Sequence, residues 1–519
     1  MRSLAYLIAI LFFAAMPPLA RAQLKVIDPP ESFFEKVREE HRDSARAFYK
    51  KYLDVDGIPV AAAGIVADQA LLRTHEIVSH MLAGRQDITK TMVERNMYLI
   101  IIGKDQLYTD MPENRNRRNK DYLNERVRGT GGNPTSFGEE NLLSLPLDRY
   151  DDESIGVHEF CHTIDNALRT LEPKWMLERN GTYRKAMDRG LYKFAYAATN
   201  PGEYWAEIAQ SYFDSNRVNN YNHGPIGTRE QLAVYDPDGY ALARKVFNLA
   251  PDQDWRYSWQ QKVPNVIPPP AKFGIDSYYT KFTWAREFTV VGNKASDEAL
   301  LAANNTIRKM FAYRQDILKA LIADGAKLVV LGKGESLADL PELQKLSGSI
   351  DTIARYHDYE PESKLVVVDE ENMLADPNEP LVGENQVIRG MARAFFDLTS
   401  RRPVDPNWEN RGREVQQYEL RVKRLDETFG KKLNELYEAA REKGLWSGTA
   451  SVHSPGEYWA QAVTAYFDAT GQGAPPNDAS HPIATRESLA SYDPELYKLV
   501  HETMAYEGRV DWRYWPARR

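Results

Sequence analysis

The feature that most constrains how this chain can fold is an internal duplication. The segment Arg85–Ile88 recurs as 314–317, and Pro201–Ala206 returns letter for letter at 455–460. Matching segments keep their order and lie about 230 to 257 residues apart, which is the size of a domain and far longer than a solenoid repeat unit. The 519-residue chain is therefore predicted to contain two tandem domains of one fold.

A proline-rich segment separates the two copies. Residues 263–270 read Val-Pro-Asn-Val-Ile-Pro-Pro-Pro, and proline lacks the backbone N–H that a helix interior or a central strand requires. We therefore predict a first domain over residues 23–262, an extended linker over 263–272 and a second domain over 273–519.

Hydrophobic patterning predicts a helix-rich α+β fold. Ala70–Leu82 has the period of an amphipathic helix, whereas the apolar run Met97–Ile102 ends at a glycine and is typical of a buried strand. In the second copy, Leu328–Leu331 and Leu365–Val368 are the predicted strands.

The N-terminus has the three parts of a secretory signal peptide. Arg2 supplies the charged region, Leu4–Met16 is apolar, and Ala20–Ala22 has the form of a cleavage site. We predict a signal peptide over residues 1–22 and export to the periplasm or the extracellular medium. No later apolar stretch has the roughly 18 to 20 residues that a membrane-spanning helix needs.

The net charge of the chain bears on the class of partner it can bind. With 74 acidic and 66 basic residues, the chain carries a formal charge of −8. It has no overall attraction for phosphate backbones, so nucleic acid is not an expected partner.

The single cysteine, Cys161, cannot form an intramolecular disulfide. The sequence leaves the oligomeric state open.

Residues 158–162 form an H-E-x-x-H motif. On a helix, histidines four residues apart lie on one face and can share a tetrahedral zinc ion, with the glutamate beside the open coordination position. The motif lies within a helical pattern. Its apolar stripe consists of Val157, Phe160, Cys161, Ile164 and Leu168. His158 and His162 are therefore predicted to bind Zn²⁺.

A third protein ligand has to come from elsewhere in the chain. A metzincin would place a glycine and a third histidine where Asp165 and Leu168 stand, so that pattern is excluded. A separate downstream helix is the other solution, and Glu203 and Glu207 lie four residues apart in such a segment. Their spacing lets either carboxylate reach the metal.

The two motifs together resemble the catalytic domains of anthrax lethal factor-like zinc metallopeptidases, a group of glutamate-zincins. The resemblance rests on the segments 157–165 and 196–207, is weaker around 85–88 and 110–113, and covers most of residues 45–260.

This resemblance implies a zincin-like fold and a role for each site residue. His158, His162 and Glu203 would bind one zinc ion, Glu159 would be the general base, and Tyr196 would donate to the transition state. For Tyr196 the second copy agrees, because Ala450 stands at the matching position and the ring is dispensable to the fold.

The internal copy makes the choice between the two carboxylates less simple. Glu203 also suits a helix-capping role, and the second copy keeps it as Glu457 although its histidines are gone, whereas Glu207 becomes Gln461. The duplication favours Glu207 as ligand and the resemblance favours Glu203. We predict that Glu203 binds the metal and that Glu207 orients a ligand.

Three other residues near the motifs are assigned supporting roles. Asp165 is too close along the same helix to supply another tetrahedral direction, so it is predicted to orient a ligand or stabilise the helix. Cys161 is predicted to be an inert core thiol. His223 is predicted to be an ordinary loop residue that could contact substrate.

The second copy lacks the metal ligands. A gapless alignment from Glu371 puts Arg389, Gly390 and Arg393 where His158, Glu159 and His162 stand, and arginine stays protonated. The sequence therefore predicts an exported zinc endopeptidase with a degenerate second domain and a peptide or protein substrate. A catalytically silent surface binding protein and a cell-wall peptide amidase are the alternatives.

Overall fold

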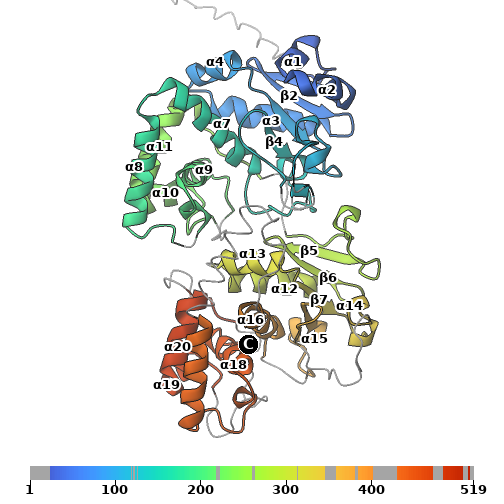
Figure 1. The fold of residues 1–519 in the computed structure, drawn as a ribbon, viewed down its shortest axis with the longest axis vertical. Helices are drawn as coiled ribbons and strands as arrows, with labels where there is room; N and C mark the ends of the chain where they lie inside the picture. Colours follow the sequence, from blue (N-terminus) through green and yellow to red (C-terminus); the bar gives the residue numbers. More distant parts are fainter. Residues whose placement is uncertain are drawn as a thin grey trace, which may run out of the picture.

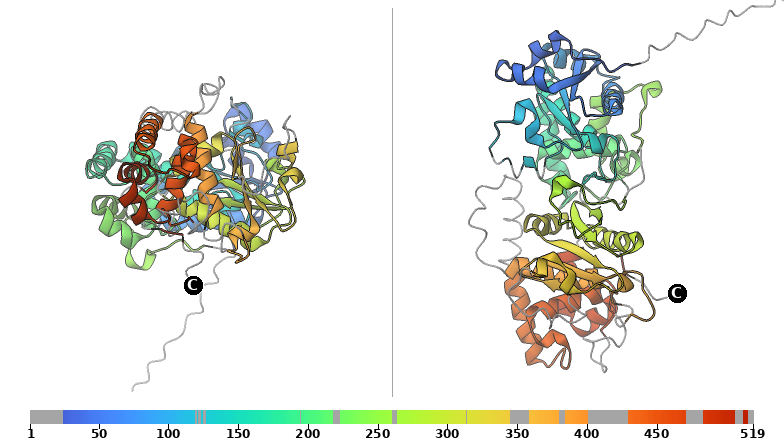
Figure 2. Two further views of the ribbon diagram at one scale, coloured as in Figure 1. Left: turned by 90° about the horizontal axis from the view of Figure 1, so that it is seen from below. Right: turned by 90° about the vertical axis from the view of Figure 1, so that its right-hand side faces the viewer.

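A computed structural model describes residues 24–118, 120, 123–124, 127–193, 195–217, 223–259, 264–312, 314–344, 358–379, 384–400, 429–470, 483–505 and 512–514. The predicted signal peptide lies outside these residues. We call 24–259 the first half and 264–514 the second half. The two halves are stacked end to end, the first in blue to green and the second in yellow to red (Figure 1), and the right-hand view of Figure 2 shows the same arrangement from the side.

The first half is built on a four-stranded mixed sheet in the order β1-β2-β3-β4. Strands β1 and β2 form an antiparallel hairpin, and β2, β3 and β4 run parallel. The strands are β1 (Tyr49–Val55), β2 (Ile58–Ala63), β3 (Leu99–Ile102) and β4 (Thr135–Gly138).

Helices cover both faces of this sheet, so its strands are buried on both sides. Alternate residues of β3 enter opposite cores: Ile101 packs with α3, α4 and α7, whereas Ile100 and Ile102 pack with α1 and α2. A second layer of helices packs around α9 (Figure 1). The helices are α1 (Glu31–Lys36), α2 (Arg42–Phe48), α3 (Asp68–Met81), α4 (Gln86–Glu94), α6 (Glu139–Leu142), α7 (Ile155–Leu171), α8 (Trp175–Asp188), α9 (Pro201–Tyr212), α10 (Arg229–Tyr235) and α11 (Pro237–Phe247).

The second half repeats this order of elements around its own core. Its sheet has the order β5-β6-β7-β9-β8, with an antiparallel β5–β6 hairpin followed by parallel β6, β7 and β9. The strands are β5 (Lys281–Ala285), β6 (Phe288–Gly292), β7 (Lys327–Leu331), β8 (Tyr359–Glu360) and β9 (Leu365–Asp369). The helices are α12 (Asp297–Met310), α13 (Gln315–Ala323), α14 (Pro341–Gln344), α15 (Glu370–Met373), α16 (Gln386–Ser400), α18 (Pro455–Tyr466), α19 (Arg486–Tyr492) and α20 (Pro494–Val500).

Equivalent residues of the two halves make the same contacts. The Arg85 guanidinium binds Asp87 and the Val246 carbonyl, and Arg314 binds Asp316 and the Thr503 carbonyl. The Asn141 side chain accepts from the Ile155 N–H as Asn372 does from the Gln386 N–H. The last pair confirms the gapless alignment of α7 with α16.

The expected elements are present. The predicted helix 70–82 is α3, and the predicted strand 97–102 is β3, so the mixed, helix-rich α+β class is confirmed. The described part of the predicted linker is not a free spacer, because Ile267 forms a backbone bridge with Phe282 of β5. Among the described residues, no helix combines the length and apolar character that crossing a bilayer requires.

Candidate metal centre

Helix α7 carries the H-E-x-x-H motif on the edge of the first core. The Ser154 side chain caps the helix by accepting from the Val157 N–H. The predicted apolar stripe is fully buried, including Cys161, and burial raises the pKa of that thiol well above its usual value. This agrees with an inert core cysteine. His158 and His162 lie one turn apart beside the stripe.

Helix α9 brings a carboxylate to the two histidines. Its N-terminus is capped by Asn200, whose side chain accepts from the N–H groups of Gly202 and Glu203. The Trp205 indole N–H donates to the Cys161 carbonyl at 2.9 Å and ties α9 to α7. The Glu203 carboxylate is therefore not needed as the cap, and it points to the histidines.

Three side-chain atoms form a compact triangle. Glu203 Oε2 lies 3.1 Å from His158 Nε2 and 3.3 Å from His162 Nε2, and the two histidine nitrogens are 3.2 Å apart. Ligands about 2.0 to 2.1 Å from a tetrahedral zinc ion are roughly 3.3 to 3.4 Å from one another. The donor atoms and their spacing therefore fit zinc.

The charged groups of this cluster shift one another's pKa values. Burial lowers the pKa of His158, but its hydrogen bond with Glu203 and the nearby carboxylates outweigh burial and raise that pKa well above its usual value. Burial raises the pKa of Glu203, yet the two histidines more than offset it and hold that carboxyl well below its usual range. A protonated His158 and an ionised Glu203 therefore form an ion pair.

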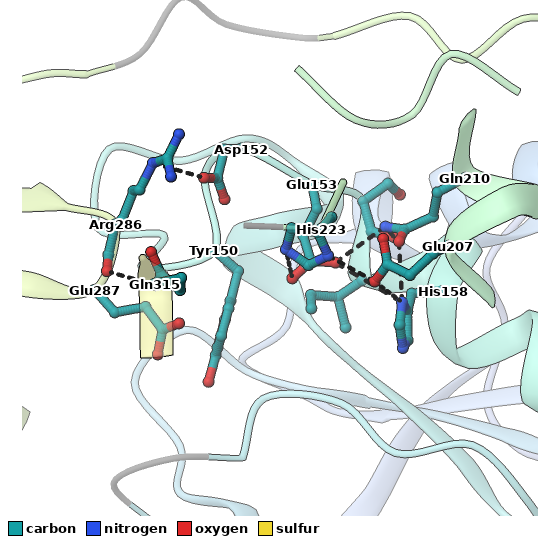
Figure 3. A network of polar contacts seen from close by, with 12 residues as sticks. Tyr150, Asp152, Glu153, His158, Glu207, Gln210, His223, Arg286, Glu287 and Gln315 are labelled. Carbon is teal, nitrogen blue, oxygen red and sulfur yellow. Dashed lines mark hydrogen bonds and ion pairs between the residues drawn. The ribbon is translucent and has the colours of Figure 1, made fainter. Parts of the chain in front are cut away.

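A buried network orients His158 from its other nitrogen (Figure 3). His158 Nδ1 lies 3.0 Å from Gln210 Oε1 and 3.5 Å from Glu207 Oε1. Gln210 in turn donates to Glu153 Oε2 at 3.0 Å. Glu207 thus contacts His158 on the side away from Glu203, as expected of a residue that orients a ligand.

A second group of possible ligands, Glu153, His158 and Glu207, shares His158 with the first. His223 sits between its two carboxylates, with Nδ1 2.6 Å from Glu207 and Nε2 3.3 Å from Glu153. Burial lowers the pKa of His223, but the two carboxylates outweigh this effect and raise it to about 9. The His223 imidazolium already pairs with both carboxylates of this group, so the geometry favours Glu203 over Glu207 as ligand.

Glu159 lies under a glycine-rich segment. A Cβ on Gly131 would lie 2.3 Å from His162 Cβ, and one on Gly129 would lie 3.0 Å from Glu159 Cγ. Burial raises the pKa of Glu159, whereas His158, His162 and the Gly131 N–H act to lower it. The close backbone thus shields the carboxylate from water on one side and donates to it.

Tyr196 enters the site from a short 3₁₀ turn, Tyr196–Ala198, that precedes α9. Its ring centroid is 6.1 Å from that of His158 and 6.0 Å from that of His223. The Tyr183 hydroxyl donates to the Ala198 carbonyl at 2.8 Å and supports the turn. Tyr196 is therefore beside the cluster, as expected.

No protein-family model, curated protein or solved structure matches this chain.

The structure bears differently on two of the supporting residues. Asp165 accepts from Arg169, Arg179 and the Trp175 indole, which fits the helix-stabilising role, one of the two predicted for it. His223 is buried within the network and is not an ordinary loop residue.

Two further residues of the network, Gln210 and Glu153, were not predicted from the sequence. Gln210 lies seven residues after Glu203 on the same face of α9, which is a signal that helical periodicity could have given. Glu153 and His223 offer no comparable local signal, because they meet the cluster only through the tertiary fold.

In the second half, arginine replaces both histidines. Arg389 forms an ion pair with Glu457 and lies 2.7 Å from Asp358, and Arg393 Nε lies 3.5 Å from Glu457. A Cβ on Gly390 would lie 2.4 Å from the Asp358 carbonyl oxygen, which leaves no room for the equivalent of Glu159. Two guanidinium groups therefore carry the positive charge at the second-half equivalent of the candidate metal centre.

Proposed function

We propose that this protein is a zinc-dependent hydrolase, most simply an endopeptidase, whose zinc is bound by His158, His162 and Glu203. The observation that carries the proposal is the triangle of ligand atoms, with sides of 3.1 to 3.3 Å. The triangle lies at the border of the core, because the side chains of His162 and Glu203 are 23% and 20% exposed. Substrate could therefore reach one side of a bound ion.

The residues around this triangle have complementary roles in peptide hydrolysis. Zinc at such a site supplies Lewis acidity and activates water at neutral pH. Glu159, shielded on one side by the glycine segment, would take a proton from the attacking water and pass it to the leaving amine. Tyr196 would donate a hydrogen bond to the substrate carbonyl oxygen as charge develops there, a contribution of about 2 to 4 kcal/mol.

Export through a signal peptide over residues 1–22 is part of the same proposal, as is a peptide or protein substrate. The net charge of −8 gives no support for a nucleic-acid substrate. An exported chain with a single cysteine depends on its two cores for stability, and each half has such a core.

Elemental analysis together with a peptide-library digest tests the proposal. We expect one zinc per chain and cleavage of internal peptide bonds, with Glu159→Gln as the zinc-bound, inactive control. Zinc without cleavage of any peptide would favour a binding protein, and cleavage restricted to cell-wall peptides would favour an amidase. A chain that binds no zinc would refute the proposal.

A further inference from the structure

The second half contacts the segment that leads into helix α7, which carries the H-E-x-x-H motif. Arg308 of α12 binds both carboxylate oxygens of Asp151 at 2.9 Å, and the Trp284 indole donates to the Leu147 carbonyl at 3.2 Å. Asp151 is two residues before Glu153, whose carboxylate contacts His223 and Gln210. The interface between the halves therefore lies directly beside the candidate metal centre.

A strained turn of the second half points into this interface. Arg286 and Glu287 form the β5–β6 turn with φ of 50° and 69°, a conformation that glycine adopts readily and residues with side chains disfavour. The first half uses Asp56 and Gly57 at the equivalent β1–β2 turn, with φ of 51° and 91°. The second half thus keeps a glutamate where its own duplicate has glycine.

Both residues of the turn face charged groups at the interface. Arg286 Nε lies 4.0 Å from Asp152 Oδ2, and Glu287 Oε1 lies 3.5 Å from Lys319 Nζ of α13. Figure 3 shows Arg286 and Glu287 beside the acidic segment that carries Asp152. Backbone strain that persists in a folded protein commonly marks a functional position.

Lys319 connects this turn to the candidate active site. Its ammonium nitrogen lies over the ring of Tyr196, 5.4 Å from the ring centroid. The equivalent residue of the first half is Lys90 on α4, whose side chain is 78% exposed and pairs with Glu94 of the same helix. The Lys319 side chain is only 8% exposed. The same residue type at the same helical position is therefore a surface lysine in one copy and an interface lysine in the other.

We propose that the second half of the chain completes the active site of the first. In this proposal Lys319, held by Glu287 of the strained turn, is a positioning residue for Tyr196. A catalytic effect of Lys319 rests on the proposed hydrolase function, whereas the positioning of Tyr196 by Lys319 does not. It gives the degenerate copy a role that needs no metal of its own.

The physical basis is attraction between a sheltered ammonium group and the face of an aromatic ring. Tyr196 lies on a three-residue turn, which by itself constrains a side chain weakly. A cation on one face and the rings of His158 and His223 nearby would hold the phenol in one orientation. Loss of the cation corresponds to roughly a 2- to 30-fold effect on any step that needs that orientation.

Fluorine NMR tests the positioning without any substrate. With 3-fluorotyrosine incorporated at position 196 of the full chain, we expect Lys319→Met to shift and broaden the resonance. Lys319→Arg, which keeps the cation, should resemble the wild type. Lys90→Met is the matched control and should leave the resonance unchanged. A wild-type resonance in Lys319→Met would overturn the proposal.

Kinetics test whether the positioning serves the reaction. On a substrate found in the peptide digest, Lys319→Met should lower kcat roughly 2- to 30-fold, with KM and zinc content unchanged. In the Tyr196→Phe background, Lys319→Met should cause no further loss. An equal loss in both backgrounds would show that Lys319 acts independently of Tyr196 and would refute the proposal.

Restoring the glycine of the first half tests whether the turn holds Lys319 in place. Glu287→Gly relieves the strained φ but also removes the buried ion pair with Lys319, and these two effects on the thermal midpoint oppose each other. The resonance at position 196 should move as in Lys319→Met. If Glu287→Gly leaves the resonance in place, the strained turn has no part in positioning. If the wild-type chain cleaves no peptide, the proposed function fails, and the resonance still decides whether Lys319 positions Tyr196.

Discussion

Removing Glu203 or Glu207 tests the proposed ligand assignment, because the two carboxylates contact different side chains: Glu203 contacts both histidines of the motif, whereas Glu207 contacts His223 and one histidine. Glu203→Ala removes one of the three atoms of the triangle, and we expect zinc affinity to fall by more than about 100-fold, beyond the effect of losing a residue that only orients a ligand. The helix should survive, because Asn200 caps α9 through two N–H groups. The loss of helix stability should stay below about 1 kcal/mol.

Glu207→Gln should have a smaller effect on the metal. Glu207 touches His158 only at Nδ1, 3.5 Å away, and its main partner is His223 at 2.6 Å. The loss of an orienting contact of this kind lowers metal affinity by roughly 10- to 100-fold, or about 1.4 to 2.7 kcal/mol. We therefore expect Glu207→Gln to be isolated with zinc bound.

Competitive chelator titration of both variants, with circular dichroism to check folding, measures these effects. Glu457→Ala is the matched control, because Glu457 is the second-half equivalent of Glu203 and its side chain is also 20% exposed. It should leave zinc affinity unchanged. If Glu207→Gln loses its zinc while Glu203→Ala retains it, the ligand is Glu207 and our geometric argument is wrong.

Four further results are expected. Glu159→Gln should abolish hydrolysis with zinc still bound, and Tyr196→Phe should lower turnover roughly 10- to 1000-fold at unchanged zinc content. Steady-state kinetics and elemental analysis measure these effects. Wild-type turnover in Glu159→Gln would show that Glu159 is not the general base. Gly131→Ala should weaken zinc binding in a chelator titration, because its Cβ would lie 2.3 Å from His162 Cβ; unchanged affinity would mean that the segment adjusts freely. Burial raises the pKa of Glu384 from its usual range to about 7. Folding stability should therefore fall by up to about 3 kcal/mol as pH rises from about 4.5 through 7, and urea unfolding of Glu384→Gln should lack this slope.

Most of the architecture followed from the sequence because it depends on local pattern. The duplication predicted two copies of one order of elements, and hydrophobic periodicity predicted α3 and β3 in their observed places. The H-E-x-x-H motif predicted two histidines on one face of a helix, since residues four apart share a face on any α-helix. These features need no knowledge of what lies across the core.

Residue spacing could not decide between Glu203 and Glu207, and the prediction of Glu203 depended on the resemblance to the metallopeptidase family. The two residues share a face of α9, so periodicity treats them alike, and only the packing of α9 against α7 brings Glu203 to within 3.3 Å of both histidines. His223 comes from a segment with no regular pattern and meets Glu207 through the tertiary fold. Distances across the core depend on how helices pack, which residue spacing does not encode.

The relation between the two halves was decided by tertiary structure alone. Lys90 and Lys319 occupy the same place in the repeated sequence, and nothing local distinguishes them. One is solvated and the other is buried against Tyr196, because burial depends on which surfaces meet when two domains pack. The sequence by itself determined the duplication, the helical motif and its ligand types, whereas the packing of the halves decided which lysine reaches the site.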